Sequence, residues 1–143
     1  MALTDYTENL ILDTLFGVND VTALGSSALD KNILHVGLFT SETSDTGGGN
    51  EVSTSGTGYA RIAVANNNSD NKWDDAVLGV KKNAEAITFA NAMASWGTIT
   101  HVAIFDNSSG GNMIAHGGLT QSKAVASGDT FKFDIGDLQI TLN

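Results

Sequence analysis

Short segments with an apolar residue at every second position recur from residue 33 to residue 142, and they constrain the fold more than any other feature. The clearest are 98–105 and 59–64, while 33–40 is apolar on both faces. Shorter segments of the same kind cover 86–89, 113–116, 123–125, 130–133 and 138–142. A period of two is typical of strands, since successive side chains of a strand point to opposite faces. The pattern predicts about seven or eight short strands.

Turn-forming residues separate these segments. Asp106–Gly111 is rich in Asn, Ser and Gly, and Ser127–Asp129 has Gly at its centre, so each predicts a hairpin connection. Several short strands at this spacing are typical of antiparallel sandwiches and barrels. We therefore expect an all-β fold, a single antiparallel β-sandwich or barrel-like domain spanning 1–143. Its β part would cover 33–143.

One short helix is predicted ahead of the strands, over residues 3–17. Thr4 is a suitable N-cap, acidic residues follow it in the first turn, and Gly17 ends the segment. Apolar residues including Tyr6 and Leu10 recur at helical spacing. This face either packs on the domain's own sheet or docks on a partner subunit. In the second case Tyr6 and Leu10 are candidate contact residues.

Two long polar segments interrupt the strand pattern and are expected to be loops. Residues 41–58 are rich in Gly, Ser and Thr, and residues 66–75 are rich in Asn and Asp. Long loops in compact domains often carry function. The role of both loops stays open at this stage. Trp73 lies in the second loop and Trp96 precedes the strongest strand. We expect Trp96 in the core and Trp73 as a candidate partner or glycan contact.

Composition excludes several classes of function. The chain has no Cys, which removes disulfides, thiolate nucleophiles and cysteine metal sites. Its net charge is −9 and it has a single arginine, so neither nucleic acid nor an anionic membrane is an expected partner. No apolar run reaches the roughly 20 residues that cross a bilayer. We expect a soluble protein.

No residue pattern indicates catalysis, a cofactor or a bound metal. The three histidines, His35, His101 and His116, fall in three different predicted strands without metal-ligand spacing. Acidic residues near Asp74 lack the arrangement of a calcium loop, and Gly47–Gly49 lacks the Lys-Ser/Thr of a phosphate loop. We therefore expect a protein that is not an enzyme and has no catalytic, cofactor-binding or metal-binding residues.

The order of these segments resembles a family of small tailed-bacteriophage virion proteins, commonly described as tail fibre or minor tail proteins. The matching segments are 3–6 (LTDY), 35–40 (HVGLFT), 51–53 (EVS), 58–61 (GYAR), 95–101 (SWGTITH), 104–106 (IFD), 110–112 (GGN), 127–129 (SGD) and 136–138 (GDL). The similarity spans nearly the whole chain. It implies a virion location, other virion proteins as partners (the major capsid protein or tail proteins) and a homo-oligomer.

Three functions follow from the residues and the resemblance together. The chain is short, and it has neither the repeats nor the stalk usual in a long fibre. We therefore expect first a capsid decoration (cement) protein that binds and stabilises the head. The alternatives are a tail fibre or minor tail protein, with host-receptor binding as one role, and a carbohydrate-binding module.

Overall fold

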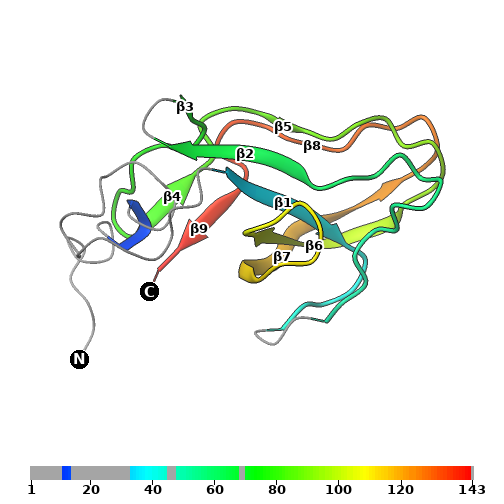
Figure 1. The fold of residues 1–143 in the computed structure, drawn as a ribbon, viewed down its shortest axis with the longest axis horizontal. Coiled ribbons are helices and arrows are strands. Elements are labelled where there is room, and N and C mark those ends of the chain that lie inside the picture. The colour runs from blue at the N-terminus through cyan, green and yellow to red at the C-terminus, as the bar shows by residue number, and fades with distance from the viewer. Residues whose placement is uncertain (1–10, 14–32, 45–47, 68–69, 143) are drawn as a thin grey trace. The chain divides into compact units, whose positions relative to one another are not determined.

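The computed structural model describes residues 11–13, 33–44, 48–67 and 70–142. In this part nine strands are present (Figure 1). They are β1 (Ile33–Phe39), β2 (Ile62–Asn67), β3 (Asp70–Asn71), β4 (Val80–Lys82), β5 (Ile87–Thr88), β6 (Gly97–Phe105), β7 (Met113–Val125), β8 (Lys132–Phe133) and β9 (Gln139–Thr141). The four ladders whose register is defined are all antiparallel. The prediction of an all-β antiparallel fold is confirmed.

The chain divides into two compact units. Unit 1 consists of Met1–Leu34, Val64–Ile87 and Phe133–Asn143, and unit 2 consists of His35–Ala63 and Thr88–Lys132. A single domain over 1–143 stays a prediction. β5 and β8 form a two-stranded ladder of their own.

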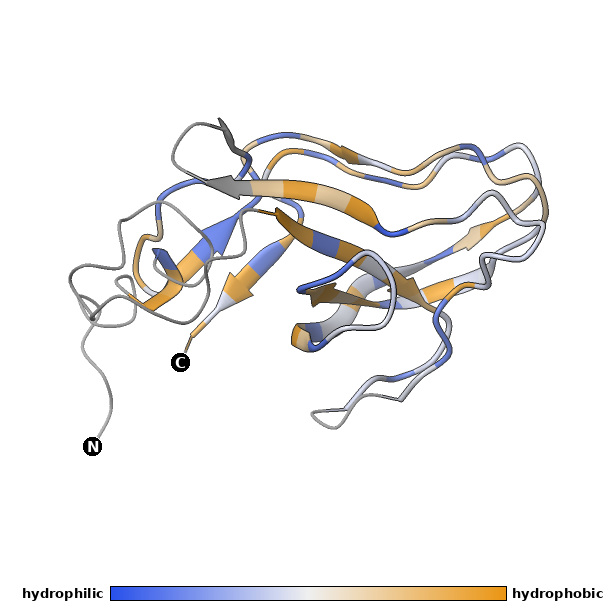
Figure 2. Cartoon of the chain, viewed as in Figure 1, coloured by the Kyte–Doolittle hydropathy of each residue, from blue (hydrophilic) through white to orange (hydrophobic). Residues whose placement is uncertain are grey.

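Unit 2 is built on the ladder of β1 and β6. His35 pairs with Phe105 at one end and Phe39 pairs with His101 at the other, and β7 continues the sheet beyond β6. β1 is apolar along most of its length (Figure 2), as expected for a strand with both faces covered. Phe39, Ala103 and Phe105 form a buried cluster between these strands.

A second buried cluster in unit 2 is aromatic and contains Tyr59, Phe89, Trp96 and Phe131. The ring of Tyr59 lies edge-on to that of Trp96 with centroids 5.4 Å apart, and Phe89 lies edge-on to Phe131 at 5.9 Å. Edge-to-face contacts at such distances stabilise a core beyond the area that they bury. The indole Nε1 of Trp96 donates to Thr57 O over 2.9 Å. The prediction that Trp96 lies in the core is confirmed.

β7 contains the two strands predicted at 113–116 and 123–125. They are joined by residues 119–122, which leave the regular pairing and which we call the excursion of β7. Along β6, Ile99 faces Lys123 and His101 faces Gly118, so residues 119–122 of β7 oppose only Thr100. The ladder is in place on both sides of this excursion. Two predicted strands therefore appear as one irregular strand at the end of the sheet order.

The predicted loop 41–58 is only partly a loop. Val52 N donates to Leu38 O over 3.0 Å, and Glu51 forms a bridge with Phe39, so residues 51–52 run alongside β1. Thr40 N donates to Asn50 O, and this hydrogen bond closes the loop between the two residues. The prediction of a continuous loop is wrong here, because a short Glu-Val segment carries too little periodicity to reveal its pairing.

In unit 1 the predicted loop 66–75 is a hairpin followed by paired backbone. β2 extends to Asn67, and Asn66 pairs with Asn71 of β3. Beyond it, Trp73 forms a bridge with Asn83, while Asp74 N donates to Lys82 O. The loop prediction is wrong for these residues, because a polar composition does not exclude backbone pairing with a distant segment.

β4 pairs with β9, and no strand was predicted at β4. Val80 faces Thr141, and Lys82 faces Gln139. A tight turn precedes β4, in which Leu78 and Gly79 both have positive φ (54° and 72°) and Val77 and Val80 exchange hydrogen bonds. This is the backbone of the hairpin turn that normally carries Asn-Gly.

The predicted helix over 3–17 lies mostly outside the described residues. Ile11–Asp13 is helical, and Leu12 and Asp13 are buried. Asp13 Oδ1 accepts from Lys81 Nζ at 2.8 Å and from Ala76 N at 2.9 Å, both in unit 1. This turn therefore packs on the chain's own unit. Among the described residues, no helix has the length and apolar character needed to span a bilayer.

Candidate functional site

Of the three contact residues predicted from the sequence, the structure describes Trp73 alone. Tyr6 and Leu10 lie outside the described residues. Trp73 is only 2% exposed, so the expectation of a loop residue with an exposed ring is wrong. Its burial follows from the pairing of 72–74 with 82–84, which turns the indole into the core of unit 1. A glycan contact at Trp73 would need this pairing to open.

Two of the three histidines have a threonine side chain as their hydrogen-bond partner. His101 Nδ1 is 2.9 Å from its neighbour Thr100 Oγ1, and His116 Nδ1 is 2.8 Å from Thr43 Oγ1. Across 11–13, 33–44, 48–67 and 70–142, no group of three His, Cys, Asp or Glu side chains is placed to hold a metal ion. Among the acidic residues of 66–75, which were not expected to bind calcium, Asp74 accepts from Lys82 N through Oδ1 at 2.6 Å.

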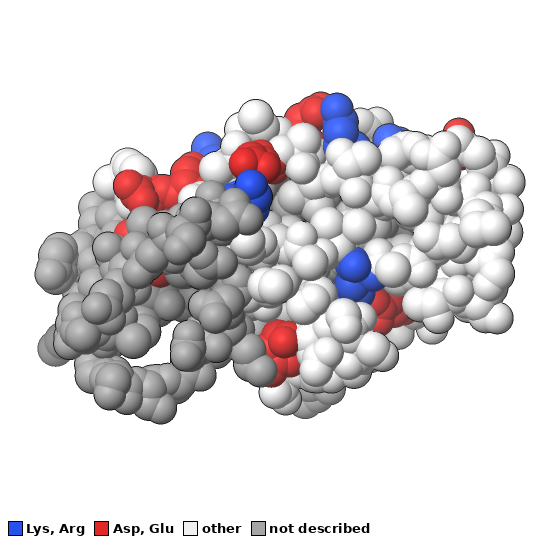
Figure 3. All heavy atoms as spheres, turned by 45° about the horizontal axis from the view of Figure 1, so that its top comes forward, with Lys and Arg blue, Asp and Glu red and all other residues white. Residues whose placement is uncertain are grey.

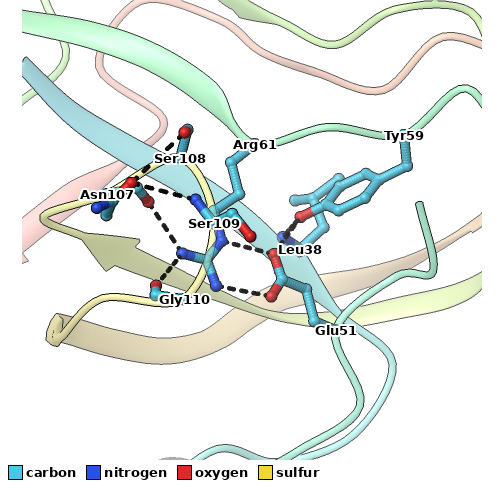
Figure 4. Close-up of polar contacts among 8 residues, drawn as sticks. All are labelled: Leu38, Glu51, Tyr59, Arg61, Asn107, Ser108, Ser109 and Gly110. Atoms are coloured by element: carbon cyan, nitrogen blue, oxygen red, sulfur yellow. Dashed lines mark hydrogen bonds and ion pairs between the residues drawn. The ribbon is translucent and has the colours of Figure 1, made fainter.

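Arg61 is the centre of a polar network in unit 2 (Figure 4). Its Nε and Nη2 donate to the two carboxylate oxygens of Glu51, at 2.7 and 2.8 Å. Its Nη1 donates to Asn107 O at 3.0 Å and to Gly110 O at 2.8 Å. The planar guanidinium suits this two-sided arrangement, because its five donors diverge in a fixed fork. We call Glu51, Tyr59, Arg61, Asn107 and Gly110 the arginine cluster.

Three segments of unit 2 bring the arginine cluster together. Glu51 is placed by the segment beside β1, and Tyr59 and Arg61 lead into β2. Asn107 and Gly110 come from the loop between β6 and β7. The guanidinium also lies over the Phe105 ring, with Cζ 3.4 Å from the centroid, a cation–π geometry. Arg61 therefore ties together segments that are up to 49 residues apart in the sequence.

The loop 106–112 is held by its own side chains. Asp106 accepts from Asn112 N at 2.8 Å through one oxygen and from Asn112 Nδ2 at 2.9 Å through the other. Gly111 has φ of 74°, and a Cβ there would collide with the Asp106 carboxylate. Only glycine fits this position. The predicted hairpin connection at 106–111 is confirmed, and its carbonyls are aimed at Arg61.

Burial sets the protonation of two groups near the arginine cluster. Tyr59 OH donates to Glu51 Oε1 at 3.0 Å and accepts from Leu38 N at 2.9 Å. The pKa of Tyr59 is raised, chiefly because burial disfavours the phenolate, and the Glu51 carboxylate adds to the effect. The pKa of His35 is lowered, first by burial and then by the Arg61 charge, against which Asp106 acts.

A hollow of about 350 Å³ opens beside the arginine cluster. Four exposed hydroxyl side chains line it, namely Ser53, Thr54, Ser108 and Ser109. Glu51 and Arg61 form part of its wall. The described lining contains no His, Lys or Cys that could activate a hydroxyl. The arrangement offers hydrogen bonds from fixed groups to a molecule in the hollow.

Sequence reasoning assigned no role to Glu51 or Arg61. Arg61 fell in the predicted strand 59–64 and Glu51 in the predicted loop 41–58, and both lie in segments that carry the family resemblance. One signal was available, because Arg61 is the only arginine of the chain and lies within a strand-like alternating segment. A lone arginine between apolar positions is usually paired when its strand is buried. Its partners in 107–110 could not be inferred from spacing.

On the face shown in Figure 3, acidic and basic atoms lie in small groups separated by uncharged surface. The view shows no continuous patch of Lys and Arg among the described residues.

The comparison with protein families identifies the chain. A family model described as "Podophage GP4 fiber I protein gp80" matches residues 2–141. No curated protein matches the sequence. The resemblance to tail fibre-type virion proteins is thereby confirmed. The family description names a fibre, so it supports the tail fibre alternative better than capsid decoration, which was preferred because of the short chain. The chain belongs to the podophage GP4 fiber I protein gp80 family and is a fibre-type structural protein of a phage virion.

Proposed function

We propose that this chain is a non-enzymatic part of the tail fibre apparatus of a podophage, held there by contacts with other tail proteins and with copies of itself. The observation that carries the proposal is the family match over residues 2–141, which includes both compact units. A match of that extent relates the whole chain to a fibre protein.

The way in which the fold is held also supports a structural role. The chain has no cysteine and therefore no disulfide. Within each unit, a basic side chain instead connects segments distant in sequence: Arg61 in unit 2 and Lys81 in unit 1. Virion parts are present in several equivalent copies, so a symmetric arrangement of chains follows from the proposed role.

The test is the number of copies in a purified particle, measured by quantitative mass spectrometry against the major capsid protein. A fibre component gives a few to a few dozen copies per particle. A gold-labelled antibody should then decorate the tail in electron micrographs. A ratio approaching one copy per capsid protein, with label over the head, would replace this proposal by capsid decoration. Absence from the particle would refute both.

A further inference from the structure

We propose that the hollow beside the arginine cluster binds a neutral saccharide through its hydroxyl groups. The inference deepens the proposed fibre role and rests on it for its biological meaning, since a fibre is the part of a particle that meets a surface. The hollow measures about 350 Å³, which lies within the range of small-molecule sites, roughly 300–1,000 Å³. That space is sufficient for a sugar unit and part of its neighbour.

Charge in the hollow favours a neutral ligand. Only Glu51 and Arg61 are charged among the lining residues, and they neutralise each other through two contacts of 2.7 and 2.8 Å. A bound ion would find no uncompensated opposite charge, and it would lose its hydration. A polyhydroxylated neutral molecule needs hydrogen bonds alone.

The hydrogen-bonding groups of the hollow match adjacent sugar hydroxyls. Glu51 Oε2 accepts one hydrogen bond, from Arg61 Nη2, and a carboxylate oxygen can accept a second. Four of the five N–H donors of Arg61 are used, which leaves one on Nη2. An acceptor and a donor therefore lie side by side. Ser108 and Ser109 both line the hollow, and a serine hydroxyl can donate or accept.

The wall of the hollow is fixed before any ligand arrives. Arg61 is held on both sides (Figure 4), and Tyr59 OH holds Glu51 through its 3.0 Å bond. The loop that carries Ser108 and Ser109 is closed by the Asp106–Asn112 pair. Groups that need no reordering lose less conformational entropy on binding. The polar contacts can therefore contribute to affinity despite their competition with water.

The affinity of one hollow is expected to be weak, in the millimolar range. Tyr59 is the one aromatic residue of the lining and is 4% exposed, so it offers little ring surface for stacking. The exposed methyl of Ala60 provides a small apolar contact. Several copies on one particle would raise the overall affinity by multivalency.

The experiment is a titration of the isolated full chain, labelled with ¹⁵N, with a panel of neutral sugars. The panel contains glucose, galactose, mannose, rhamnose, N-acetylglucosamine and their common disaccharides. At least one should shift the amide signals of Ser53, Thr54, Ser108 and Ser109 in a saturable manner. Inorganic phosphate at the same concentration should leave these signals in place. Silence across the panel, or saturable shifts with phosphate alone, would overturn the inference.

Paired variants locate the site. S109W fills the hollow from a side chain that makes no hydrogen bond in the described structure, and it should weaken sugar binding at least tenfold. S122W places the same indole on the excursion of β7, outside the hollow, and should bind as the native chain does. T54W is the second hollow variant if S109W gives a non-native spectrum. Undiminished binding in natively folded S109W or T54W would refute the site, while leaving the particle copy number and the fibre role untouched.

Discussion

Two basic side chains tie distant segments together, and they do so in different ways. Lys81 of unit 1 has a side chain with no exposure, and its ammonium donates to Asp13 Oδ1 at 2.8 Å and Asp74 O at 2.6 Å. Arg61 of unit 2 is 8% exposed, and its partner Glu51 is 29% exposed. Lys81 depends on one counter-charge, whereas Arg61 distributes four hydrogen bonds over three residues.

The contrast teaches that burial, more than the number of contacts, decides how costly a lost partner is. An ammonium without access to water cannot be rehydrated when its carboxylate is removed. A partly exposed carboxylate such as Glu51 can be rehydrated when its arginine is lost, so part of the lost interaction is replaced by water. Four substitution or titration experiments test this ranking, from the largest effect to the smallest.

Asp13→Ala should have the largest effect. It leaves the Lys81 charge buried without a counter-charge and removes the acceptor of Ala76 N, so we expect a loss of about 3–5 kcal/mol in the free energy of unfolding. Chemical denaturation followed by circular dichroism measures it. Asp13→Asn keeps an oxygen acceptor and is the matched control, with a smaller loss. Equal stability of the native chain and Asp13→Ala would show that the pair does not hold the helical turn.

Arg61→Lys should cost less, about 2 kcal/mol, although the charge is retained. A lysine cannot contact Glu51, Asn107 and Gly110 together, and it lacks the planar face over Phe105. Arg61→Ala should cost only slightly more than Arg61→Lys, because geometry is the main loss in both. The same denaturation experiment decides, and full stability in Arg61→Lys would mean that charge alone is sufficient.

Acidification should lower the stability of unit 2 through His35. Its pKa lies below the usual 6.5 in the folded chain, so the unfolded chain binds a proton first as the pH falls. The stability that depends on neutral His35 is therefore fully present above about pH 6.5, and it is lost as the pH falls below that value. Melting temperatures of the native chain and His35→Gln should converge as the pH falls. A constant difference between pH 8 and about pH 5 would exclude His35 as the cause.

Glu85→Gln should have the smallest effect. Lys72 Nζ lies 2.8 Å from Glu85 Oε1, but the two side chains are 30% and 61% exposed. Pairs of this kind contribute at most about 1 kcal/mol and are screened by salt. We expect a change within about 0.5 kcal/mol, which high salt abolishes. A loss as large as that of Arg61→Lys would contradict the ranking by burial.

Strands with clear alternation were predictable from the sequence, and strands held by polar residues were not. β1 and β6 were found with bounds within about one residue, because each fills a core with apolar side chains. β4 was missed since Val80–Lys82 has a single apolar residue and Lys81 reads as exposed. Its burial depends on Asp13, which lies 68 residues away. No local pattern carries that information.

The candidate site was predictable only in part. The hairpin loop at 106–111 was expected from its turn residues, and it supplies three of the ten residues that line the hollow. Glu51 and Arg61 were not expected, because their pairing depends on how 51–52 aligns with β1. Trp73 was misplaced for the same physical reason: an Asn- and Asp-rich neighbourhood reads as a loop, although backbone pairing with 82–84 orders it.

The excursion of β7 bears on how relatives of this chain can diverge. Residues 119–122 oppose a single residue of β6, while the ladder on either side is fixed by its own pairs, His101 with Gly118 and Ile99 with Lys123. Insertions or exchanges within 119–122 therefore leave the register of both halves unchanged. The side chains of 120–122 are exposed, so new sequence there adds surface without disturbing a core. Length variation among related fibres can accumulate at this position, and a foreign peptide can be displayed there.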